Sequence, residues 1–472
     1  MAQYTRHPAA PVPTAPEREA TGHLMLRAYA VLTMFATLAH TAVFNLLGAV
    51  GAVIVLAVLT LGVLAIWIPA IVHQRPARFP WRRLPWAALG YVAFALVSVI
   101  WSQWRAATLL TWPLLAAVTV NALFVASMLS WQELVRALSS ALKWVLGLSL
   151  LIELWVALVL RHPILPNFVT VPEGKIDPHI YWVRGNLFDG GRIQGIVGNA
   201  HTLSMMCLLA LMVFGVLWAA RVRRRGALIA WAALALVLLV GAGSATTYLC
   251  ALASAAVLLI ALLMRRAQRP SHRTAVYAGG AIVVLLAAGA GWLMQDRVLA
   301  VFGKSDDFTG RFEIWAKVWE RALTHPVAGN GFSSPWVPWD PGFAGWIVNH
   351  KLTVFHAHDM WLDVFFQLGA IGVVLMAVAW GALVWRAWFF AVDRPRWDLE
   401  ARRPYSPLSL LPTMIVVTLL VEGLVESAPI MLWGWMLLIM LSFKIKSVPL
   451  VGVGLDERAA ATAPGGTIIR AS

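Results

Sequence analysis

The sequence predicts an all-α integral membrane protein, and two features of its composition lead to this prediction. Hydrophobic residues make up 60% of the 472 residues and charged residues only 12%, about half the charged share of a soluble domain. A chain of this composition cannot cover its surface with polar groups, so soluble globular, disordered and fibrous proteins are excluded. The apolar residues also fall in long runs, and about 20 apolar residues suffice for a helix to cross a bilayer.

About twelve such runs follow one another along the chain. They lie at 25–46, 48–72, 85–102, 107–129, 134–160, 196–219, 226–243, 246–264, 274–294, 361–390, 407–427 and 429–445. The first 24 residues are polar and rich in proline, without a cleavable secretory signal. We therefore expect the following organisation: a disordered cytoplasmic tail at 1–24, helices one to nine within 25–294, helices ten to twelve within 361–445 and a cytoplasmic tail at 446–472.

The arginine clusters between the runs predict the orientation, because Lys and Arg collect on the cytoplasmic side of membrane proteins. The net charge of +15 is divided among these clusters, so it is read as a topology signal and not as a nucleic-acid surface. The clusters are Arg75, Arg78, Arg82, Arg83; Arg221, Arg223, Arg224, Arg225; Arg265, Arg266, Arg269, Arg273; and Arg386, Arg394, Arg396, Arg402, Arg403. Both termini are then cytoplasmic.

Two long segments, 161–195 and 295–360, fall on the opposite, outer side, and the other outer loops are short. We therefore expect function to reside in these two segments and in the span ends beneath them. The two cysteines, Cys207 and Cys250, lie in apolar runs and exclude a disulfide scaffold.

Arg192 stands at the mouth of the sixth span, in the first outer segment. One interpretation is that its guanidinium binds lipid phosphate or another anion. The other is an interfacial arginine whose charged head reaches the water. Position alone favours neither.

The second outer segment contains a stretch of helical spacing after Thr309. Its apolar face consists of Phe312, Trp315, Trp319 and Ala322. Arg311 lies in the expected first turn, on the side of Trp315. The helix either lies on the membrane surface, or its N-terminus and Arg311 together bind a phosphate.

Three tryptophans, Trp336, Trp339 and Trp346, follow in a segment rich in glycine and proline. A segment so broken is not expected to form a core of its own. The tryptophans therefore either mark the bilayer interface, where Trp is favoured, or stack against sugar rings.

The second outer segment ends in His358-Asp359, directly before the tenth span. His350, His356 and His358 suggest a metal at first, but His356 and His358 would diverge on a helix. No cysteine or carboxylate cluster completes a metal site, so we expect no metal and no other cofactor. Neutral imidazole accepts a proton at ambient pH, which makes His358 a candidate general base. Asp359 is the expected N-cap of the tenth span.

Four acidic residues lie within the predicted spans: Glu153, Asp363, Glu422 and Glu426. Such residues are costly in lipid and are functional candidates. By the predicted topology, all four lie in the outer halves of their spans, at the depth of the outer segments. They are expected to orient the arginines or the histidine, whereas a transporter would more typically place such groups near the midplane.

At these positions the sequence resembles the O-antigen ligase and polymerase superfamily of bacterial envelope glycosyltransferases. His358-Asp359, nine residues and Gly369-Ala-Ile-Gly372 look like the His-to-Gly motif of the ligases. Thr309-Gly310-Arg311, followed by Trp315 and Gly329-Asn330-Gly331-Phe332, is similar to their loop signature. Arg192-Ile-Gln-Gly-Ile196 resembles their Arg-to-Leu motif. Asp359 stands where the family usually has Asn, Ser or Gln, and Ile196 replaces Leu.

The resemblance implies a GT-C-type glycosyltransferase of the bacterial inner membrane whose active site faces the periplasm. It would transfer O-antigen polysaccharide from undecaprenyl pyrophosphate to a sugar hydroxyl of lipid A–core, without a metal and with inversion. His358 is expected to act as general base, and Arg311 and Arg192 as catalytic residues that bind the pyrophosphate. The residues expected to contact substrate are Trp315, Trp336 and Trp339, and those expected to support the site are Asp359, Asn330, Asp363, Glu422 and Glu426.

Three alternatives stay open at this point. An O-antigen polymerase or a protein O-oligosaccharyltransferase would use the same donor with a different acceptor. A membrane transporter for an anion or a lipid-linked intermediate would need alternating access, and His358 would be dispensable or proton-coupling. A non-catalytic envelope scaffold would need none of the candidate residues.

Overall fold

The computed structural model of the protein describes residues 21–73, 79–167, 178–221, 225–267, 269–293, 305–349, 352–393, 405–449 and 451. The two predicted tails lie almost entirely outside these residues. So do His350 and several arginines of the predicted cytoplasmic clusters: Arg75, Arg78, Arg223, Arg224, Arg394, Arg396, Arg402 and Arg403.

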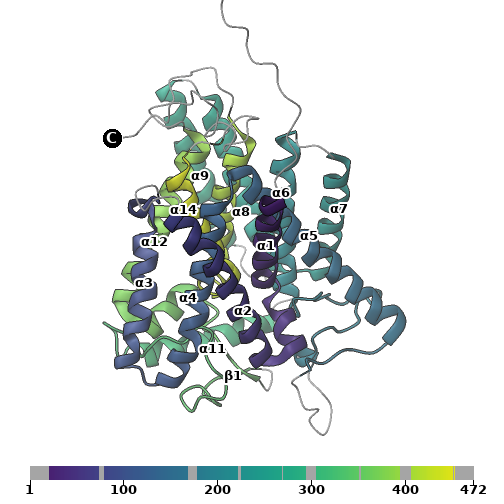
Figure 1. Cartoon of the computed structure of the whole chain (residues 1–472), viewed down its shortest axis with the longest axis vertical. Helices are drawn as coiled ribbons and strands as arrows, with labels where there is room; N and C mark the ends of the chain where they lie inside the picture. Colours follow the sequence, from purple (N-terminus) through teal and green to yellow (C-terminus); the bar gives the residue numbers. More distant parts are fainter. Residues whose placement is uncertain are drawn as a thin grey trace, which may run out of the picture.

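The described chain is helical apart from one small pair of antiparallel strands, in agreement with the predicted all-α class (Figure 1). The helices are α1 (Thr21–Leu38), α2 (His40–His73), α3 (Trp86–Val97), α4 (Arg105–Met128), α5 (Trp131–Trp155), α6 (Ala200–Ala219), α7 (Arg225–Ala242), α8 (Ala245–Arg266), α9 (Pro270–Leu293), α11 (Ser305–Ala322), α12 (Met360–Val392), α13 (Leu411–Glu422) and α14 (Leu432–Ser447). The strands are β1 (Val348–Asn349) and β2 (Leu352–Thr353).

Seven of the described helices are long and apolar enough to cross a membrane. They are His40–Val72, Arg105–Met128, Trp131–Leu160, Ala200–Ala219, Arg225–Ala242, Ala245–Arg266 and Met360–Val392. Three further apolar helices are shorter: Leu24–Leu38, Trp86–Ile100 and Pro407–Glu422. Many large apolar side chains are exposed, among them Val50 (75%) and Leu252 (69%), as expected of surfaces that face lipid. The helices support a multi-pass membrane protein, and the count of about twelve spans stays a prediction.

The helical backbone is interrupted twice in the region of the first two predicted spans, once within the first span and once where the second was predicted to begin. α1 ends at Leu38 instead of at 46, and α2 begins at His40. At this first break, His40 Nδ1 lies 3.1 Å from the carbonyl oxygen of Thr37, so a side chain contacts a carbonyl that helix continuation would otherwise satisfy. The second break is at Gly48, with φ 69° and ψ −176°, which is where the second span was predicted to begin.

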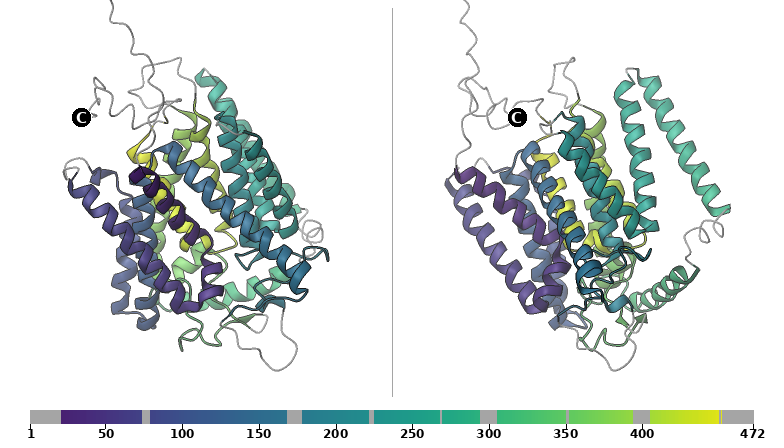
Figure 2. Two further views of the ribbon diagram at one scale, coloured as in Figure 1. Left: turned by 45° about the vertical axis from the view of Figure 1, so that its right-hand side comes forward. Right: turned by 90° about the vertical axis from the view of Figure 1, so that its right-hand side faces the viewer.

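Helix α14 lies in the middle of the bundle, where it packs against α4 and α12. Its side chains are buried on all faces, from Trp435 to Phe443, as expected of an apolar helix surrounded by protein. Helix α9, in contrast, lies at the edge of the bundle beside α8 (Figure 2). Its exposed Leu285 (71%) and Val283 (62%) are consistent with a lipid-facing helix.

Helix α12 connects two chemically different ends of the molecule. Its first turn follows His358 and Asp359 and lies near α11 and β1, in the lower part of Figure 1. At its far end, Arg265 Nε donates to the carbonyl oxygen of Ala391 at 2.6 Å.

Further basic side chains bond to helix ends at this far end. Arg273 pairs with Asp393 at 2.6 Å, and Arg83 donates to the Ser447 carbonyl oxygen at 2.7 Å. Described members of two predicted cytoplasmic clusters thus gather at the end of the bundle opposite His358.

Helix α12 is interrupted at Gly369, where φ is 61° and ψ is −162°. The interruption frees backbone groups that bond to a loop segment after α11: Asn330 N to Phe366 O, Gly331 N to Gln367 O, Ala370 N to Pro326 O and Ile371 N to Val327 O. A Cβ atom on Gly369 would lie 2.4 Å from the Val327 carbonyl carbon. The glycines of the two motifs therefore permit the loop backbone to dock into α12.

Part of the second outer segment lies in a small core that it shares with neighbouring helices. Trp336 is 1% exposed and packs against Phe343, Trp346 and Phe366. The core is closed by α11 and by the start of α4, with contributions from Ile314, Val318 and Trp104. The segment thus forms a core only together with its neighbours, as expected of so broken a segment. Buried Trp336 neither marks the bilayer interface nor exposes its ring to a sugar, so both interpretations were wrong for this residue.

Candidate functional site

His358 lies in the connection between β2 and α12. Asp359 is the N-cap of α12, as predicted, because its side chain accepts a hydrogen bond from the Leu362 backbone N–H at 2.8 Å. His358 has φ 54°, a left-handed conformation that non-glycine residues rarely adopt. Such conformations are concentrated at functional sites, where the surrounding structure maintains them.

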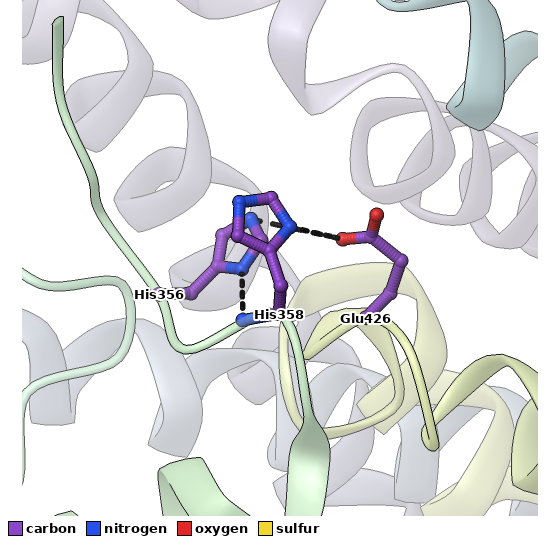
Figure 3. A group of neighbouring side chains, drawn as sticks. All are labelled: His356, His358 and Glu426. Atoms are coloured by element: carbon purple, nitrogen blue, oxygen red, sulfur yellow. Dashed lines mark hydrogen bonds and ion pairs between the residues drawn. The ribbon is translucent and has the colours of Figure 1, made fainter. Parts of the chain in front are cut away.

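One carboxylate holds both His358 and Arg311. Glu426, in the loop after α13, has Oε2 3.1 Å from Nδ1 of His358 (Figure 3). Its Oε1 accepts a hydrogen bond from Nη2 of Arg311 at 2.7 Å. The side chains of Glu426, Arg311 and His358 are 13%, 20% and 26% exposed, so the group is partly shielded and still open to a ligand.

This contact determines which nitrogen of His358 can accept a proton. Oε1 of Glu426 accepts a hydrogen bond from the charged guanidinium of Arg311 at 2.7 Å, which favours the ionised form of the carboxyl group. An ionised carboxylate only accepts hydrogen bonds, so Nδ1 of His358 carries a hydrogen. In the neutral form of His358, Nε2 then has the free lone pair. It faces away from Glu426 in Figure 3, which leaves it available to a hydroxyl group.

His356 packs against His358, with ring centroids 4.1 Å apart, so the prediction that the two rings diverge was wrong. The reason is that both residues precede α12 and are not on a helix. The backbone N–H of His358 donates to Nδ1 of His356 at 3.1 Å, which assigns the hydrogen of neutral His356 to Nε2. Burial, followed by the neighbouring charge of His358, lowers the pKa of His356 to about 3.

The ligand atoms of His356, His358 and Glu426 lie within 4.8 Å of one another, a spacing that could hold a metal ion. Two bonds oppose this use. Nε2 of His356 carries a hydrogen because Nδ1 is an acceptor, and Arg311 already compensates the charge of Glu426. The described geometry therefore fits acid–base chemistry better than metal coordination.

Asp363, in the first turn of α12, anchors the segment between β2 and His358. Its Oδ1 accepts hydrogen bonds from Trp336 Nε1 at 3.0 Å and from Gln367 Nε2 at 2.7 Å. Its Oδ2 accepts a longer one from the Ala357 backbone N–H at 3.4 Å. Trp336 is therefore part of the support beneath His358 and does not present its ring to solvent, whereas Trp339 is 66% exposed.

Helix α11 presents Arg311 to the site. The helix begins at Ser305, earlier than predicted, so Arg311 lies beyond the first turn and not at a free N-terminus. Its buried face is formed by Ile314, Val318 and Ala322. Of the predicted apolar face, Ala322 belongs to this buried face, whereas Phe312 is 60% and Trp319 is 52% exposed, as in a helix that lies on the membrane surface. Trp315, next to Arg311 on the helix surface, is partly buried.

Asn330 ties the loop to its surroundings and lies apart from the histidine pair. It is 1% exposed, and its Nδ2 donates to the carbonyl oxygens of Arg321 and Phe366 at 3.2 and 3.1 Å. Its Oδ1 lies 3.0 Å from His325 Nδ1. These bonds give Asn330 a supporting role through the backbone of α12.

In the described part of the chain, Arg192 bonds to the end of α7 and not to the group around Glu426. Its Nε donates to the carbonyl oxygen of Ala242, at the end of α7, at 2.9 Å. It lines a cavity of about 370 Å³ whose other walls include Leu150, Leu187 and Val240. Glu153 orients this segment, because its Oε1 accepts from the backbone N–H groups of Gln194 and Gly195, both at 2.8 Å.

The sequence analysis did not single out His201 and Ser244. His201 Nε2 is 3.1 Å from Glu422 Oε1, and its Nδ1 is 3.0 Å from Ser244 Oγ. One feature of the sequence could have indicated His201. It is a histidine in the first turn of α6, close in the sequence to Arg192. Nothing local in the sequence connects it with Glu422, because 221 positions separate the two.

The group around Glu426 can perform one kind of chemistry well. Nε2 of His358 can remove a proton from a hydroxyl group, and the guanidinium of Arg311 can stabilise an anion beside it. Arginine has five N–H donors, and one bond to Glu426 leaves others for a phosphate. The arrangement suits transfer to a hydroxyl group with an anionic leaving group.

Comparison with known proteins agrees with this chemistry. Residues 230–377 match a family model described as O-Antigen ligase, and this segment contains Arg311, Asn330, His358 and Gly369. No curated protein matches the chain. The family match bears out the resemblance seen in the motifs and supports the O-antigen ligase superfamily for this protein.

Proposed function

We propose that this protein is an O-antigen ligase. It transfers O-antigen polysaccharide from undecaprenyl pyrophosphate to a sugar hydroxyl of lipid A–core. The observation that carries the proposal is the shared carboxylate of Glu426, which holds a base and a cation side by side. The family match over 230–377 supports the same class of enzyme.

In the proposed reaction, Nε2 of His358 removes the proton of the acceptor hydroxyl. The oxygen forms a bond to the anomeric carbon as the bond from that carbon to the pyrophosphate oxygen breaks. Attack opposite the leaving group inverts the anomeric centre. Glu426 keeps the imidazole oriented and stabilises the imidazolium that forms, a role like that of the acid in a catalytic triad.

Two arginines bind the pyrophosphate in this proposal: Arg311 beside His358, and Arg192, which bonds to the last residue of α7. Their contacts with phosphate strengthen as negative charge develops on the leaving group, so no metal or other cofactor is required. Exposed Trp339 and partly buried Trp315 are proposed to contact sugars, while buried Trp336 supports the loop together with Asp363.

We further propose that the site faces the periplasm from the bacterial inner membrane and that both termini are cytoplasmic. The gathering of Arg83, Arg265 and Arg273 at the opposite end of the bundle supports this orientation, because positive charge marks the cytoplasmic side. A GT-C-type arrangement is part of the same proposal.

Reconstituted transfer tests the proposal. Purified protein in liposomes is mixed with undecaprenyl-pyrophosphate-linked polysaccharide and lipid A–core, with EDTA and without nucleotide. We expect a ladder of modified lipid A–core on a gel, and a rate lower by about a hundred- to ten-thousandfold for His358→Ala. The matched control is His272→Ala, an exposed histidine at the opposite end, which should retain the wild-type rate.

The acceptors in parallel reactions separate the alternatives. If undecaprenyl-linked repeat units are extended while lipid A–core stays unmodified, the protein is a polymerase. If a protein substrate receives the glycan, it is an O-oligosaccharyltransferase. If no acceptor is modified and labelled donor crosses the liposome membrane, the transferase proposal is wrong and transport replaces it.

A further inference from the structure

A second histidine–carboxylate contact lies beside the first, and the proposed reaction does not use it. His201 Nε2 contacts Glu422 Oε1 at 3.1 Å, and its Nδ1 contacts Ser244 Oγ at 3.0 Å. The Glu422 side chain is 0% exposed, and its Oε2 has no hydrogen-bond partner in the described part of the chain. A buried carboxylate with so few donors depends strongly on the one imidazole that faces it.

The contact joins the ends of three helices that pack against one another. His201 is in the first turn of α6, which Asn199 caps. Ser244 is the N-cap of α8 and accepts from the Thr247 backbone N–H at 3.4 Å. Glu422 is the last residue of α13. One imidazole ring therefore fixes three helix ends relative to each other.

The helix end at Ser244 leads to Arg192. Ala242, two residues before Ser244, provides the carbonyl oxygen that accepts from Arg192 Nε at 2.9 Å. Gly243 between them has φ 56°, so the turn from α7 to α8 is tight. A shift of this turn would move the partner of Arg192.

The helix end at Glu422 leads to the other half of the site. The backbone N–H of Glu426 donates to the Glu422 carbonyl oxygen at 2.8 Å. Glu426 in turn holds His358 and Arg311. The two carboxylates, Glu422 and Glu426, thus belong to one turn of backbone, each with its own histidine.

His201 does not itself have the geometry of a second catalytic base. Both ring nitrogens are bonded to protein groups, so neither is free for a substrate. Ser244 is 2% exposed and caps α8, so its hydroxyl is not a nucleophile in a serine–histidine–acid arrangement. The contacts of His201 instead fix the positions of Ser244 and Glu422 relative to each other.

We propose that His201 is a positioning residue that fixes the Arg192-bearing side of the site relative to the Glu426–His358 pair, through Ser244 on one side and Glu422 on the other. This inference rests on the proposed function, because it assigns Arg192 and His358 to one reaction. It predicts that loss of His201 weakens use of the pyrophosphate donor more than it slows the chemistry at His358.

The test uses the full chain in liposomes with three variants: His201→Phe, Glu422→Gln and both changes together. His162→Phe is the matched control, because His162 is an exposed histidine whose ring bonds to the adjacent Pro163 carbonyl oxygen. Transfer is measured at varied undecaprenyl-pyrophosphate-linked polysaccharide. We expect the donor KM of His201→Phe to rise about tenfold, since misplacement of a positioning group is costly, with a smaller change in kcat.

Hydrogen exchange in the absence of substrate gives a second readout that does not depend on activity. We expect faster exchange at 239–246 in His201→Phe and in Glu422→Gln, and no change in His162→Phe. The double variant removes the imidazole and the charge of the buried carboxylate, so it should recover part of the thermal stability lost in His201→Phe, while its donor KM stays high. A merely structural histidine would not produce this separation of stability from donor KM.

Each result decides one of the two proposals. If folded His201→Phe keeps the wild-type donor KM and the wild-type exchange at 239–246, the positioning role is wrong. If His201→Phe does not fold, Glu422→Gln, which keeps the shape of the side chain, decides in its place by the same measurements. If wild-type protein transfers no polysaccharide but exchange at 239–246 responds to His201→Phe, the proposed function fails while the coupling between the helix ends stands.

Discussion

Arginine serves different purposes at the two ends of α12. At the far end, Arg265 donates to the carbonyl oxygen of Ala391 at 2.6 Å and to Ser409 Oγ at 2.7 Å. At the near end, Arg311 donates to Glu426, whose other oxygen holds His358. The first arginine satisfies backbone groups where helices end, and the second shares a charged partner with a candidate base.

The difference shows that the bonded partner, and not the residue type or its depth, indicates the role of an arginine in this protein. Carbonyl oxygens at a helix end need a donor in every state of the molecule. Glu426, in contrast, also contacts a histidine, so the hydrogen bond from Arg311 to Glu426 can be exchanged for one to a phosphate that binds. We therefore expect the two ends to respond differently to the same substitution.

The largest expected effect comes from lysine in place of arginine at each end. Arg311→Lys keeps the charge but loses the planar set of donors that fits phosphate, so transfer should slow by about a hundred- to thousandfold. Its melting temperature should stay close to that of wild type. The measurements are initial rates of lipid A–core modification and thermal unfolding in detergent.

Arg265→Lys is the counterpart at the far end. It should lower the free energy of unfolding by about 1–3 kcal/mol, because buried carbonyl groups lose a donor. Its rate per folded molecule should match wild type. The different roles of the two arginines would be contradicted if Arg265→Lys slowed transfer as much as Arg311→Lys does. They would also be contradicted if Arg311→Lys mainly lowered the free energy of unfolding.

The next effect concerns two glycines of α12. Gly369→Ala places a Cβ atom 2.4 Å from the Val327 carbonyl group at a residue with φ 61°, and should cost about 2–3 kcal/mol of stability. Gly381→Ala is the matched control in the same helix, because no described atom lies within 4 Å of its added Cβ. Denaturation in detergent compares the two, and equal stabilities would show that loop docking at Gly369 is dispensable.

The smallest effect is expected for Glu313→Gln on the exposed surface of α11. A hydrogen bond from Lys317, together with its charge, lowers the pKa of Glu313, so the small contribution of the pair to stability is present at neutral pH and lost as the pH falls through the pKa of Glu313. Both side chains are solvated, and exposed pairs contribute little. Thermal unfolding at pH 7 and at pH 4 should hardly distinguish the variant from wild type. A clear loss of transfer would assign this face to the site.

Much of the architecture follows from apolar runs and their arginine-rich connections, because burial in lipid leaves a strong local pattern. The break at Gly48 and the N-cap at Asp359 are likewise local features. Helical spacing predicted an apolar face of α11 that includes Phe312 and Trp319, which are exposed. It did not single out Ile314 and Val318, because their contacts in the loop core come from distant parts of the sequence.

The site could be predicted only in part. His358 and Arg311 stand out by motif, and Glu426 was expected, from its depth in the predicted span, to orient the arginines or the histidine. That it contacts both could not be predicted, because 68 and 115 positions of sequence separate it from them. His356 was set aside because helical spacing was assumed, whereas the chain before α12 turns at left-handed His358 and brings the two rings together.

The left-handed backbone at His358 also predicts how selection acts on this position. Glycine adopts this conformation without steric cost, so His358→Gly should melt at a higher temperature than His358→Ala. Both variants lose the contacts of the imidazole with Glu426 and His356, and only alanine keeps the strained φ angle. Once the histidine is lost, selection for stability would favour glycine at this turn, and a requirement for activity retains the histidine.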